Sequence, residues 1–258
     1  MEGNGWDPNQ YLRFAEQRRR HIDDLFTLIK PVVGGRAADL GCGTGDLTAE
    51  LHRRLGLAET VGVDSSRQML RETAQLHIGG LHFELADMAT WTGENYDLIF
   101  SNAALQWLPN HPRLVSHFHK SLREAGQLAF QVPTNRDHEA HLVAIDVAQE
   151  PPFCEILGSD HLDPFSSVME PQAYAETFHH AGFTDQSVQL RVYTHYMKSP
   201  QELYDWVRGG LLVHYRRFMN SDLFEAFASQ YKRRLFERIG ESGPYLHIWK
   251  RIICWAQR

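Results

Sequence analysis

Three closely spaced glycines lie in the stretch Ala38 to Gly45, where a short apolar run gives way to a helical pattern. Gly41, Gly43 and Gly45 have the spacing G-x-G-x-G, and Asp39 precedes them. Glycine lets a backbone turn sharply and approach a ligand, and the following helix offers unpaired N–H groups. A dinucleotide fingerprint needs G-x-G-x-x-G, so that a pyrophosphate reaches the helix N-terminus. The earlier third glycine and the preceding acid instead favour a nucleoside ligand that carries a positive group.

Two further acids follow the next two predicted strands, Asp64 after residues 60–63 and Asp87 after residues 81–85. An ionised carboxylate is only an acceptor, so an acid at a strand end can bind both hydroxyls of a ribose. Taken singly, each acid is most often a solvated loop carboxylate or a helix cap. Three acids in order, each associated with a strand, indicate a shared ligand.

The elements that must position these residues alternate along the first half of the chain, which predicts an α/β protein with a parallel sheet. Leucines four residues apart predict a helix over 46–55, and Ser65 and Ser66 are candidate N-caps for a helix that ends near Gln75. Prolines predict a loop-rich region between residues 133 and 171. Further strands are expected at 37–40, 96–100, 127–132, 183–197 and 245–256, and helices at 112–122, 171–181, from 200 to the Gly209–Gly210 pair, and 223–239.

Alternation in the strand 183–197 predicts that Val188, Leu190 and Val192 form its buried face. Ser199 and Glu202 have the spacing of a capping box, with a proline between them at the first helical position. The two helices that follow form an insertion before the last strand, which we expect to lie over the carboxyl edge of the sheet as a lid.

The composition is that of a folded soluble protein, with 43% hydrophobic and 22% charged residues among 258. A formal charge of −6 argues against nucleic acid and anionic membranes as partners. Three scattered cysteines without a CxxC pair argue against disulfides and a structural zinc site, and no metal is predicted. Since neither a secretory signal nor an apolar run long enough to span a membrane is visible, we expect a cytoplasmic protein. The oligomeric state is left open.

The glycine stretch resembles motif I of class I S-adenosylmethionine-dependent methyltransferases. The resemblance implies an α/β fold with a doubly wound, mostly parallel seven-stranded sheet, Rossmann-like, with a helical lid insertion before the last strand. It implies S-adenosylmethionine as cofactor and S-adenosylhomocysteine as product. In that family the glycine loop passes the methionine part and the acid at its head helps to hold the amino group. The resemblance assigns Asp39, Gly41 and Gly43 to the methionine part of the cofactor, and Asp64 and Ser65 to the ribose. It assigns Met69, Asp87 and Met88 to the adenine, and Asn102 to a further contact with the cofactor.

A closer resemblance links three further segments, Trp6 to Phe14, Leu105 to His111 and Asp205 to Val207, to trans-aconitate methyltransferases. This family methylates a carboxylate of a small tricarboxylic acid, and the similarity spans nearly the whole chain. It implies one domain over 1–258, with a cofactor-covering segment at 1–30 that contains Tyr11, a cofactor-binding core at 36–135 and the lid insertion at 199–243. The residues expected to line the acceptor pocket are Gln106, Trp107, Trp206, Arg208 and Arg216.

One departure bears on the acceptor. After Gly209–Gly210 the chain reads Leu211 to Tyr215, where the family tends to have an arginine in a Gly-Leu-Arg-Pro run. Arginine pairs bidentately with carboxylates, so its loss puts a tricarboxylate in doubt unless Arg208, Arg216 or Arg217 replaces it.

Several alternatives therefore stay open. The acceptor can be a different small molecule, such as a natural-product carboxylate, a phenol or a carrier-bound acyl group, or the chain can bind the cofactor without catalysis. A carboxylate is already ionised at neutral pH, so no catalytic acid or base is predicted for it. A phenol or amine would need a base, for which His111, His138 and His214 are candidates.

Overall fold

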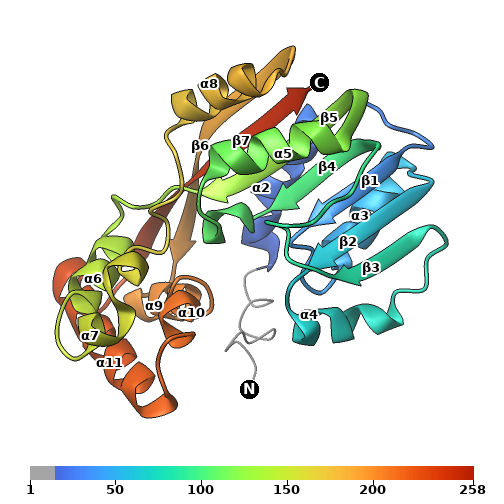
Figure 1. Cartoon of the computed structure of the whole chain (residues 1–258). Coiled ribbons are helices and arrows are strands. Elements are labelled where there is room, and N and C mark those ends of the chain that lie inside the picture. The colour runs from blue at the N-terminus through green and yellow to red at the C-terminus, as the bar shows by residue number, and fades with distance from the viewer. Residues whose placement is uncertain (1–14) are drawn as a thin grey trace. The chain divides into compact units, whose positions relative to one another are not determined.

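The computed structural model describes residues 15–258 and contains one seven-stranded sheet with the strand order β3-β2-β1-β4-β5-β7-β6 (Figure 1). Strands β1 to β5 are parallel to one another, whereas β7 is antiparallel to β5. The strands are β1 (Arg36–Leu40), β2 (Glu59–Asp64), β3 (Leu81–Leu85), β4 (Tyr96–Asn102), β5 (Leu122–Pro133), β6 (Asp185–Met197) and β7 (Tyr245–Gln257). The expected doubly wound, mostly parallel sheet is confirmed.

Helices connect the strands in the alternating order that the sequence predicted. The described α-helices are α2 (Ala15–Leu28), α3 (Asp46–Leu55), α4 (Arg67–Glu72), α5 (His111–Ser121), α6 (Glu139–Ala148), α7 (Phe153–Leu157), α8 (Pro171–Ala181), α9 (Pro200–Arg208), α10 (Leu212–Arg216) and α11 (Ser221–Ile239). Short 3-10 helices occur at η1 (Thr73–Gln75), η2 (Leu105–Trp107) and η3 (Ser159–His161). The predicted bounds of α3 and α8 are confirmed, since Gly56 and Gly182 end these helices in the left-handed conformation.

The chain divides into two compact units. The sheet unit consists of His21–Pro133, Ser167–Arg191 and Arg251–Arg258. The helical unit consists of Thr134–Ser166 and Val192–Lys250 together with the described residues before His21. The predicted core over 36–135 lies almost wholly in the sheet unit, and the predicted insertion over 199–243 lies in the helical unit.

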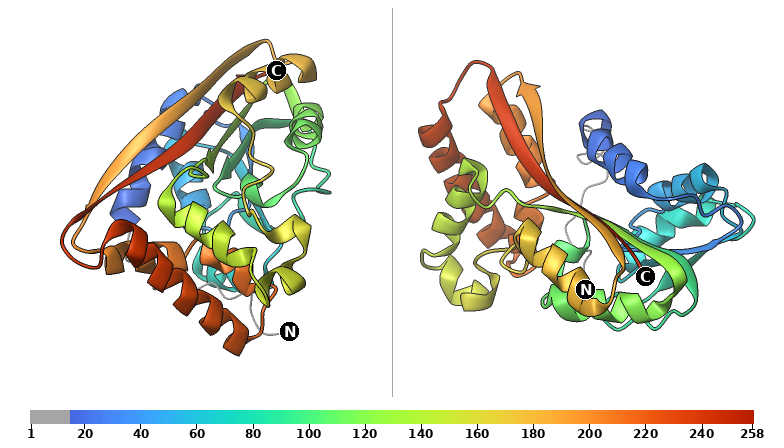
Figure 2. Two further views of the ribbon diagram at one scale, coloured as in Figure 1. Left: turned by 90° about the vertical axis from the view of Figure 1, so that its left-hand side faces the viewer. Right: turned by 90° about the horizontal axis from the view of Figure 1, so that it is seen from above.

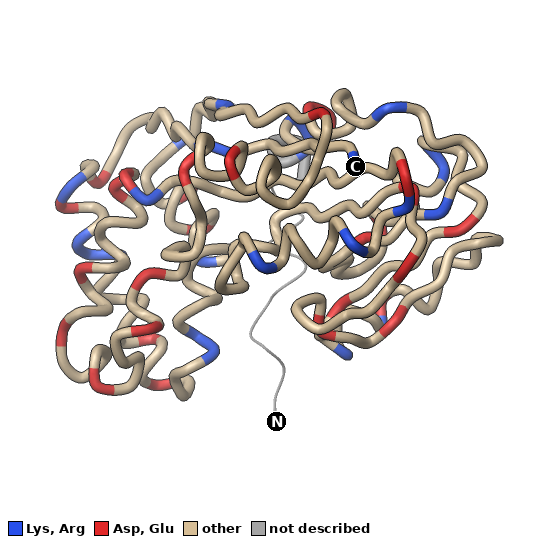
Figure 3. Tube along the Cα trace, turned by 45° about the horizontal axis from the view of Figure 1, so that its top comes forward, with Lys and Arg blue, Asp and Glu red and all other residues tan. Residues whose placement is uncertain are grey.

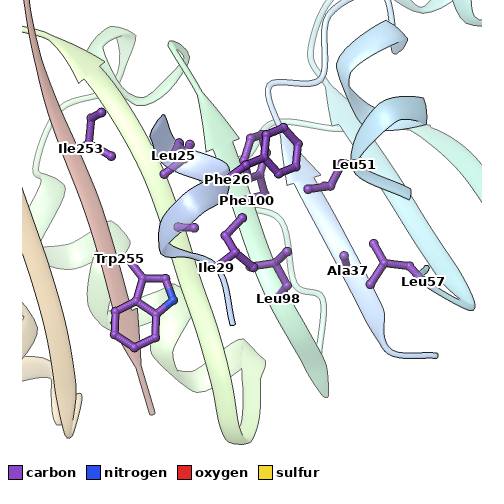
Figure 4. Close-up of a cluster of buried hydrophobic side chains, with 11 residues drawn as sticks. Leu25, Phe26, Ile29, Ala37, Leu51, Leu57, Leu98, Phe100, Ile253 and Trp255 are labelled. Atoms are coloured by element: carbon purple, nitrogen blue, oxygen red, sulfur yellow. The ribbon is translucent and has the colours of Figure 1, made fainter. Parts of the chain in front are cut away.

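The core of the sheet unit lies where α2 and α3 cover one face of the strands (Figure 4). Leu25 and Phe26 of α2 and Ile29, which directly follows this helix, pack against this face. The Phe26 ring stacks on Phe100 with centroids 5.7 Å apart. Helices α5 and α8 cover the other face (Figure 2), where the Phe130 ring makes an edge contact with Tyr174. Because both faces are covered, β1, β4 and β5 from Gly126 onward are almost continuously buried.

In the helical unit, α11 packs against α6 through apolar and charged contacts. The Tyr231 hydroxyl donates to the Ala140 carbonyl at 3.1 Å, and Arg234 pairs with Glu150 at 2.5 Å. Arg238 also pairs with Glu139 at 2.9 Å. Throughout the described chain, acidic and basic residues are interspersed rather than collected into blocks of one sign (Figure 3). None of the described helices has the length and apolar content needed to cross a membrane.

In the second half of the chain, one prediction was wrong and another was incomplete. The expected buried face of β6 is the more exposed one, since Leu190 is 51% and Val192 59% exposed while Tyr193 is buried. Tyr193 packs against Trp249 of β7. Aromatic packing therefore determines which face of β6 is buried, and it is the face opposite to the one that the alternation of Val188, Leu190 and Val192 predicted. The loop-rich region between 133 and 171 also contains α6 and α7, which the sequence analysis did not predict and which bury apolar side chains such as Val143, Val147 and Phe153.

The predicted capping box of α9 does not form. The helix begins at Pro200 as expected, but the Ser199 side chain makes no capping bond. Glu202 accepts a hydrogen bond from the backbone N–H of Lys198 rather than of Ser199. In α11, Leu223 is only partly buried, and Phe224 is buried beside Phe227, which broadens the apolar face.

Candidate functional site

The glycine loop after β1 is held by its own backbone geometry. Gly41, Gly43 and Gly45 all have positive φ, between 58° and 82°, which is the region that favours glycine. A Cβ on Gly41 would lie 2.2 Å from the Ala104 Cβ, so only glycine allows the two loops to approach this closely. A Cβ on Gly43 would meet nothing within 4 Å. The loop is therefore closed at Gly41 and leaves open space beside Gly43.

Asp64 at the end of β2 connects this loop to the next strand. Its Oδ2 accepts from the Gly43 N–H at 2.9 Å, and its Oδ1 accepts from the Ser66 N–H at 2.8 Å. Each carboxylate oxygen can accept a second hydrogen bond, so the group is oriented and still able to bind two hydroxyls. The half-buried Asp64 is thus positioned before any ligand binds, as the ribose assignment requires.

Asp39 lies one residue before the end of β1 and is only 2% exposed. The Thr48 hydroxyl of α3 donates to its Oδ2 at 2.7 Å. Burial, with a smaller contribution from the negative charge of Asp64, raises the pKa of Asp39 to about 7, although the Thr48 hydrogen bond acts in the opposite direction. A buried carboxylate with this pKa gains strongly from a positive ligand group, such as an amino group.

Thr48 offers a test of how Asp39 is held. Thr48→Val removes the hydroxyl donor, so we expect the pKa of Asp39 to rise further and the free energy of unfolding at pH 8 to fall by about 1–3 kcal/mol. Urea unfolding of Thr48→Val and of the matched variant Thr48→Ser, which keeps the hydroxyl, measures this. We expect a smaller loss in Thr48→Ser, and an unchanged free energy of unfolding in Thr48→Val, which keeps the size of the side chain, would show that the hydrogen bond does not matter.

The remaining cofactor candidates follow β2 and β3 in the order that the sheet imposes. Ser66, not Ser65, is the N-cap of α4, since its hydroxyl accepts from the Met69 N–H at 3.3 Å. Ser65 is exposed. Asp87 is also exposed, and its Oδ1 accepts from the Ala89 N–H at 2.9 Å. Because β3, β2, β1 and β4 are consecutive neighbours, the residues at their ends form a row along one edge of the sheet.

Met88, one residue beyond Asp87, lies close to the glycine loop. Its Cε would be 3.0 Å from a Cβ on Gly41. The loop after β3 therefore comes up to the loop after β1, which is the placement the adenine assignment needs.

Asn102 ends β4, and Gln106 and Trp107 follow in η2. The Asn102 Oδ1 accepts from the Gln131 amide of β5 at 2.7 Å. Ala103 has a positive φ of 53° that is uncommon for a residue other than glycine, and its carbonyl accepts from the Gln106 amide at 2.7 Å. Gln106 is 4% exposed, and its Oε1 has no hydrogen-bond partner among the described residues. A buried amide oxygen without a donor is costly, which favours a ligand donor beside it.

The other predicted acceptor residues lie in the helical unit. Trp206 packs against Trp249 with ring centroids 5.7 Å apart. Arg208 is held by Glu225 at 2.7 Å and by the Tyr204 hydroxyl at 2.8 Å, so its guanidinium already has a carboxylate partner. Arg216 is exposed beside Phe224. Their roles stay predictions, and Tyr11 lies outside the described residues.

The three histidines considered as bases all have structural partners. His111 uses both ring nitrogens, with the Tyr174 hydroxyl at 2.6 Å and the Leu105 carbonyl at 2.9 Å. His138 caps α6, since its Nδ1 accepts from the Ala140 N–H, and the Nε2 of His214 bonds to the His161 carbonyl. Desolvation lowers the pKa of all three imidazoles, so they are neutral at pH 7. These contacts disfavour acceptors that need a histidine base.

Sequence reasoning did not find Thr48 or Gln131. Thr48 is a small polar residue inside a helical pattern, and only the three-dimensional fold brings it to Asp39. Gln131 gave a weak signal, because it interrupts the apolar run of β5 and is fully buried.

Comparison with known proteins identifies related chains. A family model for a methyltransferase domain matches residues 14–188. A trans-aconitate 2-methyltransferase from Deinococcus radiodurans is 36% identical over 234 residues, covering 89% of this chain and 90% of the relative. One from Variovorax paradoxus is 31% identical, and one from Escherichia coli O1:K1 is 33% identical, each covering 98% of both chains.

Solved structures share the fold at low sequence identity. A methyltransferase structure from Bacillus halodurans has a TM-score of 0.60 at 12% identity, covering 91% of this chain and 97% of that one. A Haemonchus contortus phosphoethanolamine N-methyltransferase in complex with S-adenosylhomocysteine has a TM-score of 0.55 at 15% identity. The match covers 91% of this chain and 51% of that one.

Proposed function

This chain belongs to the S-adenosylmethionine-dependent methyltransferases, and we propose that it methylates a carboxylate of a small polycarboxylic acid such as trans-aconitate, giving a methyl ester. The observation that carries the proposal is the similarity, at 31–36% identity over 89–98% of the chain, to trans-aconitate 2-methyltransferases. Both the glycine loop and the sheet that such an enzyme needs are present.

The residues of the carboxyl edge fit this cofactor. Asp39 would face its amino group, because a buried carboxylate needs a cation. Asp64, oriented by two backbone N–H groups, would accept the ribose hydroxyls, and the open space beside Gly43 lets a ligand approach the backbone. Asp87 and Met88 would border the adenine. The acid–glycine–acid arrangement is unsuited to a pyrophosphate, because the carboxylates of Asp39 and Asp64 would repel its negative charges.

Methylation of a carboxylate needs no general acid or base from the protein. When bound, the cofactor supplies a methyl group on a positively charged sulfur, which a carboxylate oxygen can displace directly. The chain's own task is to align the acceptor and exclude water. Since His111, His138 and His214 are all engaged structurally, the described part of the site supports an acceptor that is already ionised.

An acceptor screen tests the proposal. We expect S-adenosylhomocysteine to form with trans-aconitate and related tricarboxylates, with mass spectrometry showing the methyl ester, and not with phenols or carrier-bound acyl groups. Turnover should stay nearly constant between pH 7.5 and 9, because no base has to lose a proton. Methylation of a phenol but of none of the acids would contradict the proposed acceptor. Tight binding of S-adenosylhomocysteine without any turnover would instead favour a non-catalytic binding protein.

A further inference from the structure

An arginine that the sequence analysis did not consider lies at the carboxyl edge of the sheet. Arg251 of β7 pairs with Pro133, the last residue of β5, so its backbone is at the edge where β4 and β5 end. Its Nη1 donates to the Gln131 Oε1 at 3.3 Å, and the Gln131 amide donates to Asn102 at 2.7 Å. These contacts form a polar chain from β7 across β5 to β4, within the sheet unit.

The side chains of Asn102, Gln131 and Arg251 lie on one face of the sheet. Asn102 is directly opposite Gln131, and Gln131 is directly opposite Ile253, which belongs to the core under α2. Paired residues in neighbouring strands point to the same face, and so do residues two apart in a strand. Asn102 and Gln131 thus put polar groups into the row of Ile253, the next row on this face after that of Phe100, and Figure 4 shows Phe100 and Ile253 on this face. Gln131 is fully buried, so its amide needs hydrogen-bond partners, and Asn102 and Arg251 provide them.

We infer that Arg251, oriented by Gln131, binds a carboxylate of the methyl acceptor that is not itself methylated. The inference rests on the proposed function. Asp64 and Asp87 line the same edge and would repel a polyanion, so an acceptor with several carboxylates needs a cation there. The half-buried guanidinium supplies that charge and pairs with carboxylates through a planar fork. It also offers a replacement for the arginine that is missing after Gly210.

The geometry favours the acceptor over the cofactor's own carboxylate. The guanidinium reaches Gln131 on β5, two strands and so about 10 Å from β1, after which the glycine loop begins. The amino and carboxylate groups of the cofactor are on the same carbon, and Asp39 of β1 is the proposed partner of the amino group. A group bound by Arg251 therefore lies beyond the loop after β4, on the acceptor side.

Arg251→Gln tests the inference. We expect the KM for trans-aconitate to rise by about tenfold or more, with kcat and the affinity for S-adenosylhomocysteine nearly unchanged, because hydrogen bonds to a charged group are lost. Arg251→Lys keeps the positive charge but lacks the planar guanidinium, so its KM for trans-aconitate should lie between those of the wild type and Arg251→Gln. Arg53→Gln, on the exposed surface of α3, is the matched control for the loss of one charge and should behave like the wild type. Thermal unfolding of each variant checks that it is folded.

A second acceptor separates binding from general effects. An analogue with one carboxylate changed to an amide should be a weaker substrate for the wild type, whereas Arg251→Gln should no longer distinguish it from the triacid. An unchanged KM in Arg251→Gln would overturn the inference. So would weaker binding of S-adenosylhomocysteine with unchanged binding of methylthioadenosine, which lacks the carboxylate, since Arg251 would then bind the cofactor. If the wild type neither binds nor methylates any polycarboxylate, the proposed acceptor class is wrong and the inference fails with it.

Discussion

Asp39→Asn is expected to stabilise the protein without cofactor at pH 8 and to abolish tight cofactor binding. Burial raises the pKa of Asp39 from 3.8 to about 7, so ionising this carboxyl opposes folding. The cost is absent below pH 4, grows between pH 4 and pH 7, and is constant above pH 7. A shift of about 3 pKa units corresponds to about 4 kcal/mol, which is the upper bound for the gain in unfolding free energy on removing the charge.

The same charge gives cofactor binding its pH dependence. Below pH 7 a proton must leave Asp39 before the amino group can pair with it, so the affinity for S-adenosylhomocysteine should rise nearly tenfold per pH unit up to about pH 7 and then level off. Titration calorimetry between pH 5.5 and 8.5 measures how the affinity for S-adenosylhomocysteine changes with pH. Asp39→Asn should bind weakly, with an affinity that does not change over this range. Asp222→Asn, which changes an exposed acid in the first turn of α11, is the control. The same slope in Asp39→Asn as in the wild type would assign the proton to another group.

Asp64→Ala is expected to reduce both cofactor affinity and stability. The change removes the acceptor for the Gly43 and Ser66 N–H groups as well as for the ribose hydroxyls. We expect the dissociation constant of S-adenosylhomocysteine to rise roughly 10-fold to 100-fold and the free energy of unfolding to fall by about 1–3 kcal/mol. Calorimetry with the nucleoside and urea unfolding without it give the two values separately.

Two comparisons make the result specific. Asp64→Asn keeps one carbonyl acceptor, so it should retain more stability than Asp64→Ala but still lose affinity. A 2′-deoxy analogue of the cofactor product should lose affinity for the wild type and little further for Asp64→Ala. Unchanged affinity in both variants would remove Asp64 from the ribose site. Glu72→Ala, an exposed acid on α4, controls for net charge.

The sequence by itself determined the cofactor half of the sheet. The spacing of leucines and the flanking glycines were enough for α3, because helix periodicity and left-handed caps are local properties. The order of Asp39, Asp64 and Asp87 after successive strands was equally local. Once strands β1 to β4 pair in parallel, those residues must lie along one edge, so local signals were sufficient for that row.

Only the tertiary structure decided which residues meet across long sequence distances. Arg251 reaches Gln131, 120 residues earlier in the chain, because β7 lies antiparallel beside β5. The buried face of β6 likewise depends on Trp249 of a neighbouring strand, so the aliphatic alternation indicated the wrong face. Such contacts join side chains more than 50 residues apart in the sequence. The packing free energy of a pair like this produces no periodic pattern in either segment, so it cannot be predicted from one segment alone.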